Sequence, residues 1–145
     1  MSILTNIVAA EDDEIEAVGE AEHPIDEWSG IEMRDIDTAK IVALHALLTG
    51  DLLDDAWANY EPIYVSAAEG AIVLRLADEL AAKLAELDED AVANVGAELA
   101  ATEAFEAEGW DTDEITGMVD EMANLARLAD SQCQALLIWM HPLRT

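Results

Sequence analysis

Apolar residues along this chain recur either at helical spacing or in short runs typical of strands. The strand-like runs are residues 3–9, 71–76 (AIVLRL) and 135–140 (ALLIWM). Short runs of this kind, bounded by polar or turn residues, favour strands because helices usually need ten or more residues. The last run is six consecutive apolar residues, which predicts a central strand covered on both faces.

The N-terminal half contains two predicted helices. Residues 11–22 give a short acidic helix, and residues 23–30 give a loop because they contain Pro, Ser and Gly. The clearer helix covers residues 37–50. Asp37 can accept hydrogen bonds from its first free amides, and Gly50 lies where a left-handed residue often ends a helix. The apolar face of this helix carries Ile41, Leu44 and Leu48.

Three more helices are predicted in the C-terminal half. Asp78 and Asp88 each begin one, and a connection over residues 105–110 follows. Asp111 and Glu114 then have the spacing of a capping box in its aspartate variant. The longest predicted helix begins there, and its continuous apolar stripe consists of Ile115, Met118, Met122, Leu125 and Ala129.

Strands near both ends with helices between them predict a small mixed sheet packed by several helices. This pattern favours an α+β domain, with an α/β domain as the alternative. The length of 145 residues predicts one domain over 1–145, which would bury roughly 70% of the surface of its unfolded chain. Because 52% of the residues are hydrophobic, the chain is expected to fold, unlike an acidic disordered tail.

The net charge of the chain limits which classes of molecule it can bind. The chain has 33 acidic and 6 basic residues and a formal net charge of -27. Nucleic acids and anionic lipids are bound by clustered Lys and Arg, so we expect neither nucleic-acid nor membrane binding. Between Lys83 and Arg127 there are 13 acidic residues and no basic one, which favours a basic protein as partner. The alternative is that the acidity is an adaptation to high salt.

The compartment and the chemistry are limited by what the sequence lacks. The single cysteine, Cys133, cannot form an internal disulfide, which favours a reducing compartment. The apolar start of the chain has no preceding Lys or Arg and runs into acidic residues, unlike a signal peptide, so we expect a cytoplasmic protein. No phosphate-binding glycine loop or nucleophile-elbow motif occurs, and we expect neither a cofactor nor catalysis.

Histidine and carboxylate positions give no complete metal motif. His45 lies on the apolar face of the 37–50 helix without a second ligand at a suitable spacing, so we interpret it as a hydrogen-bonded histidine of the core or its boundary. The alternative is a ligand-binding or enzymatic pocket near His45. Asp111 and Asp113 partly match a calcium loop, but Ile115 occupies the third ligand position.

Three stretches of the chain resemble the YfbM-like family of small bacterial proteins. They are residues 37–50 (DTAKIVALHALLTG), 71–92, and 108–140, which begins with Glu-Gly-Trp. The most specific piece is Leu-His-Ala-Leu-Leu-Thr-Gly at 44–50, and the chain differs at Ile41, where the family usually carries tryptophan. The resemblance implies an α+β or α/β domain without established catalytic activity. The resemblance also implies that some relatives are candidate immunity proteins against bacterial toxins.

These observations predict a non-enzymatic acidic protein that binds and neutralises a basic partner. The partner would be a toxin effector domain, and the chain an immunity protein or antitoxin; the oligomeric state is left open. Residues 51–65 are predicted to be irregular chain plus a short strand, and they contain aromatic residues flanked by acids. Aromatic anchors inside a polar rim are typical of interfaces. The predicted anchors are Trp57, Tyr60 and Trp110, and the predicted steering acids are Asp51, Asp54, Asp55, Glu106, Glu108, Asp111 and Asp113.

Overall fold

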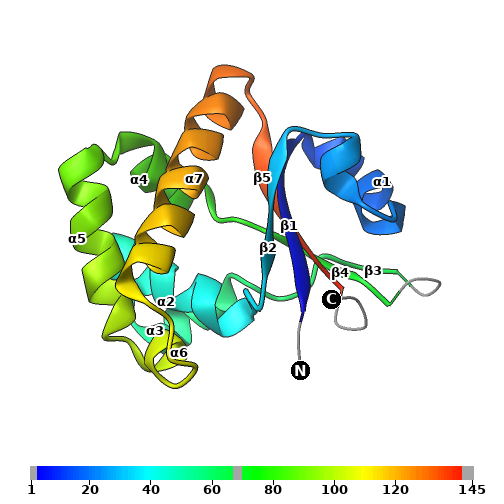
Figure 1. The fold of residues 1–145 in the computed structure, drawn as a ribbon. Helices are drawn as coiled ribbons and strands as arrows, with labels where there is room; N and C mark the ends of the chain where they lie inside the picture. The colour runs from blue at the N-terminus through cyan, green and yellow to red at the C-terminus, as the bar shows by residue number, and fades with distance from the viewer. Residues whose placement is uncertain (1–2, 67–69, 142–145) are drawn as a thin grey trace.

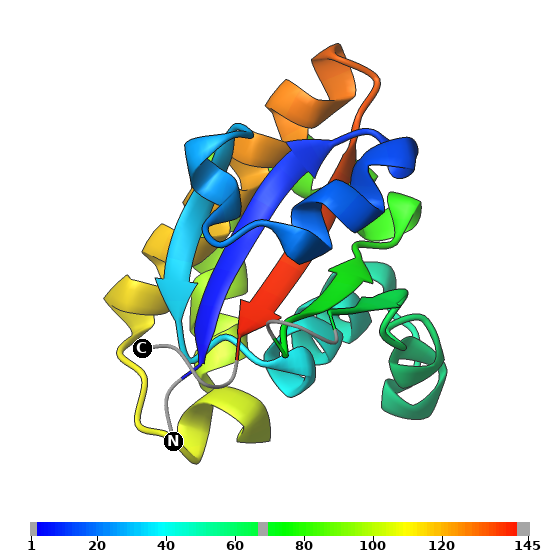
Figure 2. The same ribbon diagram turned by 90° about the vertical axis from the view of Figure 1, so that its right-hand side faces the viewer.

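A five-stranded antiparallel sheet organises the fold (Figures 1 and 2). The structure is a computed structural model that describes residues 3–66 and 70–141. The strand order is β2-β1-β5-β4-β3, and every pairing between the described strands is antiparallel. The strands are β1 (Leu4–Ala10), β2 (Gly30–Arg34), β3 (Tyr64–Val65), β4 (Ile72–Arg75) and β5 (Ala135–His141).

Helices cover both faces of this sheet (Figure 1). One side carries α2 (Thr38–Thr49), α3 (Leu53–Ala58), α4 (Asp78–Glu86), α5 (Glu89–Ala100), α6 (Glu103–Glu106) and α7 (Thr112–Ser131). The other side carries α1 (Ile15–Glu20), and two short 3₁₀ helices, η1 (Asp12–Glu14) and η2 (Pro24–Asp26), flank α1 in the sequence. The predicted α+β class is confirmed.

The two central strands are buried on both faces. All seven residues of β1 are buried, because one face packs against the larger group of helices and the other against α1 and its neighbours. Ile7 pairs with Ile138 on the first face, and Val8 pairs with Leu137 on the second. The prediction that residues 135–140 form a central, doubly covered strand is therefore confirmed.

The predicted ends of α2 are also confirmed. The Asp37 carboxylate accepts a hydrogen bond from the amide of Lys40 at 3.1 Å. Gly50 has a φ of 80° and ends the helix in the left-handed conformation, which a residue without Cβ adopts without strain. These two residues fix where α2 begins and stops.

Three elements differ from the sequence-based prediction. Strand β2 was missed because it is a short edge strand, and the start of it, Gly30, was assigned to a loop. A Cβ at Gly30 would lie 2.4 Å from the carbonyl oxygen of Ile7, so glycine is required for the strands to approach. Helices α3 and α6 were missed because six and four residues are too few to show helical periodicity. The sheet is antiparallel rather than mixed.

Helix α7 is the longest helix, with 20 residues. Its apolar stripe packs into the larger core, as predicted, through Ile115, Met118, Met122, Leu125 and Ala129, and Val119 joins them. The predicted capping box at Asp111 does not form, since the Asp111 side chain makes no capping hydrogen bond to the described residues of the helix. Within residues 3–66 and 70–141, no helix is both long and apolar enough to cross a membrane.

Two aspartates at helix starts provide a matched stability test. Asp88 accepts a hydrogen bond from the amide of Ala91 at 2.7 Å, whereas Asp111 has no such bond. Both carboxylates lie at helix N-termini and gain similarly from the helix dipole. Asp88→Ala is expected to lower the free energy of unfolding by about 1 kcal/mol, because it also removes a cap. Asp111→Ala is expected to cost less, and equal losses in urea unfolding would contradict the assignment of the two caps.

Candidate functional site

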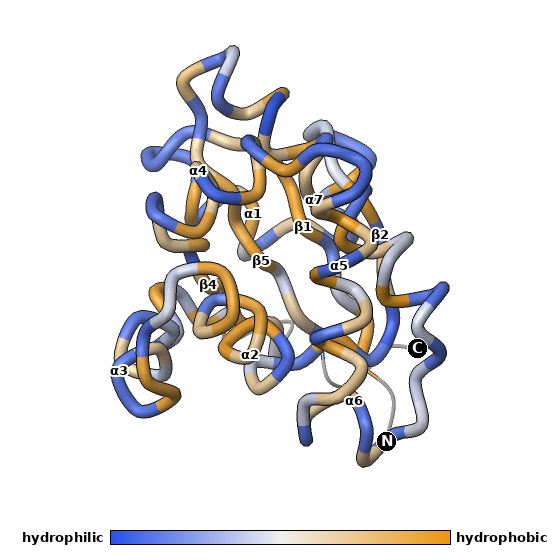
Figure 3. The backbone as a smooth tube through the Cα atoms, turned by 90° about the vertical axis from the view of Figure 1, so that its left-hand side faces the viewer, coloured by the Kyte–Doolittle hydropathy of each residue, from blue (hydrophilic) through white to orange (hydrophobic). Residues whose placement is uncertain are grey.

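Helix α2 lies between α3 and α6 (Figure 3), and residues of these three segments line an apolar groove. The helix is apolar on most of its circumference. Ile41, Leu44 and His45 are buried on one face, and on the face that lines the groove Val42 and Ala43 are buried, whereas Ala46 and Leu47 are partly exposed. Helices α3 and α6 cover that face only in part and leave a groove of about 580 Å³. The α2 residues that line it are Ala39, Val42, Ala43, Ala46 and Leu47.

Helix α3 adds large apolar side chains to the groove and its surroundings. Leu53 and Trp57, one turn apart on α3, line the groove and remain 58% and 45% exposed. The neighbouring Leu52 is 74% exposed. Single exposed apolar residues are common, but a cluster beside a groove indicates a binding surface. If a partner buried these side chains, their apolar surface would be removed from contact with water, which favours association.

Acidic side chains are exposed on both helices that flank the groove. Asp54 and Asp55 are exposed in the first turn of α3, and Glu103 and Glu106 are exposed on α6. Among the described residues that line the groove, Glu103 alone carries a formal charge. An approaching partner therefore meets an apolar surface inside a negative rim.

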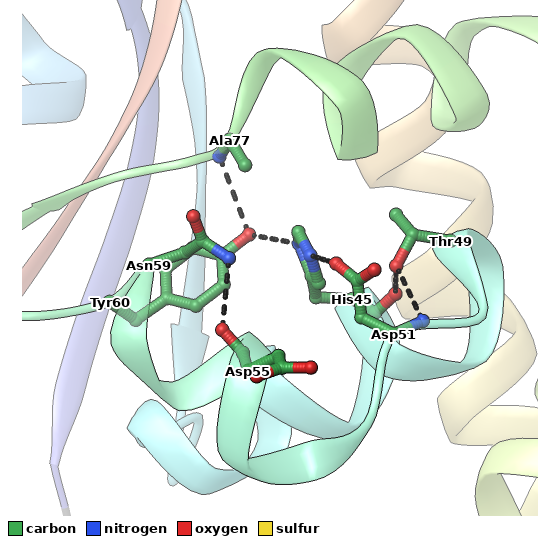
Figure 4. A network of polar contacts seen from close by, with 7 residues as sticks. All are labelled: His45, Thr49, Asp51, Asp55, Asn59, Tyr60 and Ala77. Carbon is green, nitrogen blue, oxygen red and sulfur yellow. Dashed lines mark hydrogen bonds and ion pairs between the residues drawn. The ribbon is translucent and has the colours of Figure 1, made fainter.

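A buried histidine fixes the segment that carries α3 (Figure 4). His45 on α2 is 1% exposed, and its Nδ1 lies 2.8 Å from the hydroxyl oxygen of Tyr60. Its Nε2 lies 2.8 Å from a carboxylate oxygen of Asp51. Asp51 precedes α3 and Tyr60 follows it, so one imidazole ring holds both ends of the helix. The position of Leu53 and Trp57 in the groove depends on this connection.

The hydrogen bonds assign the proton on the His45 ring. The Asp51 carboxylate accepts from Nε2, so in the neutral ring Nδ1 is the acceptor and the Tyr60 hydroxyl donates to it while accepting from the Ala77 amide at 3.3 Å. The prediction that His45 is a hydrogen-bonded core histidine is confirmed.

This network also resembles a set of catalytic groups, but its chemistry is unsuitable for nucleophilic catalysis. Burial raises the pKa of the Tyr60 hydroxyl to about 12. A nucleophile or general base needs a lowered pKa and access to substrate. Tyr60 is only 2% exposed, and both nitrogens of His45 are occupied. The arrangement is suited to holding chain segments together.

A buried lysine fixes the other side of the groove. Lys40 on α2 is 1% exposed and forms an ion pair with Glu108, which follows α6, and a longer one with Asp37 at 3.7 Å. Its ammonium also lies 5.9 Å from the ring centroid of Phe105 and 5.8 Å from that of Trp110. Rings at this distance attract a cation through their π electrons. Lys40 thereby ties α6 and the following turn to α2.

The structure separates the predicted partner-binding residues into two groups. Trp57, Asp54, Asp55 and Glu106 are exposed next to the groove, as an interface requires. Tyr60 was expected to be an exposed anchor, and this is wrong because its ring is buried and its hydroxyl bonds to His45.

The remaining predicted residues have structural partners or lie on a different element. Asp51 accepts from His45, Glu108 pairs with Lys40, and Trp110 is half-buried with its ring 5.6 Å from that of Phe105. Asp111 and Asp113 are exposed at the start of α7. These two carboxylates add to the negative charge of the surface but do not line the groove.

The most exposed apolar residues of the site were not predicted. Leu52 and Leu53 lie between Asp51 and Asp54, and an apolar pair enclosed by acids is a signal that the sequence does contain. The wall formed by Thr102 to Ala104 has no comparable signal, because its place beside α2 results from tertiary packing.

A second hollow, of about 620 Å³, is lined mainly by charged groups between η2 and β2. There His23 lies 2.6 Å from Glu32 and 3.2 Å from Asp26. The hydrogen bond to Glu32 is the main cause of a raised His23 pKa. Because charged surface stays hydrated, this hollow offers little apolar burial, and the groove beside α2 is the stronger candidate.

One group of carboxylates has the proximity that a metal ion needs. Glu11, Asp13 and Glu14 offer oxygens within 4.8 Å of one another near α1. Two of these residues are exposed, and Glu14 already accepts bonds from the amide of Glu11 and from the indole of Trp28. The group has the character of a solvated acidic surface.

Replacing each of the two tyrosines in turn compares the stability contribution of the buried network with that of a surface hydrogen bond. Tyr60→Phe leaves His45 Nδ1 and the Ala77 amide without their hydroxyl partner, and we expect a loss of about 1–3 kcal/mol in unfolding free energy. Tyr64→Phe removes a hydrogen bond to Glu20 at the surface and should cost less. Urea unfolding with unchanged m-values measures both. Equal losses would contradict the clamp role of Tyr60.

Alkaline titration tests the same groups independently. Burial at Tyr60 and the hydrogen bond to Glu20 at Tyr64 raise both pKa values to about 12, above the ordinary value of 10.0. Both neutral phenols therefore stabilise the fold below pH 10, and this contribution is lost as the pH rises from 10 to 12. Tyrosinate absorbance should appear together with unfolding. Ionisation of either tyrosine near pH 10 in the folded protein would contradict the assigned contacts.

Comparisons with known proteins identify no relative of this chain: no family model, no curated protein and no solved structure matches it. The resemblance to the YfbM-like family remains a prediction from the sequence.

Proposed function

We propose that this protein is a non-enzymatic, stoichiometric binder of a basic protein. The observation that carries the proposal is the exposed apolar surface of Leu53 and Trp57 inside a rim of carboxylates. The negative rim would steer a basic partner and raise the association rate. Burial of the apolar side chains would then slow dissociation, because they become exposed to water again when the complex separates.

The positions of the groove walls support this role. His45 fixes both ends of α3, and Lys40 ties the segment after α6 to the same helix. A surface that is already ordered loses less conformational entropy on binding. The positive charge of Lys40 is paired with Glu108 and Asp37, so these two carboxylates add less negative potential than Asp54 and Glu103, which form no ion pair within the part of the chain that the structure describes.

The partner that we propose is a bacterial toxin domain, with this chain as its immunity protein or antitoxin. Support comes from the net charge of -27 and from the family resemblance of the sequence. If the toxin were a nuclease, carboxylates such as Asp54 and Asp55 would occupy the places of nucleic-acid phosphates. No nucleic acid or anionic membrane is part of this proposal, because neither complements an acidic rim.

The alternative is an enzyme or ligand-binding domain that uses a pocket at His45. It has less support because the ring is buried and both of its nitrogens are engaged. The groove lies on the other face of α2 and is not lined by His45.

Matched removal of charge tests the electrostatic step. A pull-down from the host at low salt provides the partner, and its association rate is measured as a function of ionic strength. Asp54→Asn with Asp55→Asn should lower the rate several-fold, since steering by charge contributes roughly 10 to 10³ in rate. Asp13→Asn with Glu16→Gln removes the same charge on the opposite side of the sheet and should have a smaller effect. A rate that is indifferent to salt would overturn the proposal.

A melting experiment separates this role from salt adaptation. If the acidity served only high-salt stability, the protein would need molar salt to fold. Stability in dilute buffer would remove that explanation for the charge.

A further inference from the structure

We infer that the groove between α2, α3 and α6 binds one amphipathic helix of the partner, with an apolar stripe toward Trp57 and Leu53 and Lys or Arg along both margins. This inference rests on the proposed function and adds the form of the partner's contact. It follows from the chemistry of the groove walls, from their shape and from the distribution of charge.

The walls favour a helix over an extended segment. The floor of the groove is the middle of α2, where the backbone amides and carbonyls of Val42, Ala43 and Ala46 are already bonded within the helix. Its polar lining consists of Thr102, whose hydroxyl donates to the carbonyl of Leu99 at 2.6 Å, and Glu103. An extended peptide here would bury backbone groups without partners, and each such group is costly. A helix satisfies its own backbone and presents only side chains.

The shape of the groove fits the same occupant. Ala39, Ala43 and Ala46 lie on one face of α2, spaced four and three residues apart, and their small side chains allow a second helix to approach closely. Leu53 and Trp57 have the four-residue spacing of a helical ridge and form the α3 wall. The 12 residues of α2 extend about 18 Å, enough to contact three turns of a partner helix.

The charges select a basic partner and disfavour a second copy of this chain. Asp54 and Asp55 lie on α3 and Glu106 lies on α6, and these helices are on opposite sides of α2 (Figure 3). Helical geometry turns Asp54 about 100° and Asp55 about 200° from Leu53, so Asp54 and the groove-lining Glu103 are the carboxylates closest to the two edges of a bound helix. Two copies of this chain, each with a net charge of -27, would repel one another at such a contact.

Two synthetic peptides of identical Leu and Lys composition provide the test. In one, leucines follow the helical period of 3.6 residues, and in the other they alternate with lysines at the strand period of two. The peptides carry the same charge, so they differ only in the structure that buries their leucines. Calorimetric titration into the full-length protein compares their affinities, and chemical shifts of an isotope-labelled peptide report its conformation when bound.

We expect the helical-period peptide to bind at least about tenfold more tightly and to become helical. Leu53→Ala with Trp57→Ala should remove that preference. The matched control is Ile63→Ala with Val65→Ala, since these side chains are 45% and 61% exposed but do not line the groove, and it should bind as the unmodified protein does. Circular dichroism of each variant confirms that it is folded.

The possible failures are distinguishable. Equal, salt-sensitive affinities for the two peptides, unaffected by the groove variant, would overturn the helix inference while leaving the electrostatic proposal in place. Tight binding of the strand-period peptide in the groove would likewise overturn it. Failure of both peptides to bind at low salt would overturn the inference, and it would also count against the proposed function.

Discussion

The apolar circumference of α2 is the constraint on which the rest of the site depends. A helix that is apolar on most sides must be covered on most sides, and Ile41, Val42 and Leu44 of α2 are fully buried, whereas the face with Ala46 and Leu47 remains partly exposed. The remaining face must pack against short segments of chain, which are α3 and α6. Because these helices have only six and four residues, they cover the face incompletely. The groove is the consequence of that incomplete cover.

Polar side chains of the same helix hold those short segments in place. Isolated helices of this length are unstable in water, so α3 and α6 need tertiary contacts. His45 and Lys40 supply them: the bond from His45 to Tyr60 is buried and shielded from competing water, and the buried Lys40 pairs with Glu108, whose side chain is half-exposed. Each clamp joins residues far apart in the chain: Tyr60 is 15 positions after His45, and Glu108 is 68 positions after Lys40. The helix thus organises both its apolar and its polar surroundings.

Much of the fold could be predicted from the sequence, but less of the site. Asp37, Gly50 and the run ending at Met140 act through local rules of capping and strand burial, and the structure confirms them. Strand β2 could not be predicted, because the need for Gly30 arises from a neighbouring strand. The burial of Tyr60 was missed for the same reason, since its partner His45 lies on another helix. Local sequence patterns predict helix ends and central strands, whereas contacts between segments distant in the chain become visible only in the folded structure.

Helix α3 separates the residues that maintain the fold from those that would choose a partner. Ala56 and the adjoining Tyr60 face inward and are buried, whereas Leu53 and Trp57 face outward and contribute little to the core. Substitutions at the outward positions can therefore alter recognition with little loss of stability. If the partner changes during evolution, Leu53 and Trp57 can be substituted to match it with little loss of thermal stability. Such independence is the usual requirement for rapid divergence of specificity on a constant scaffold.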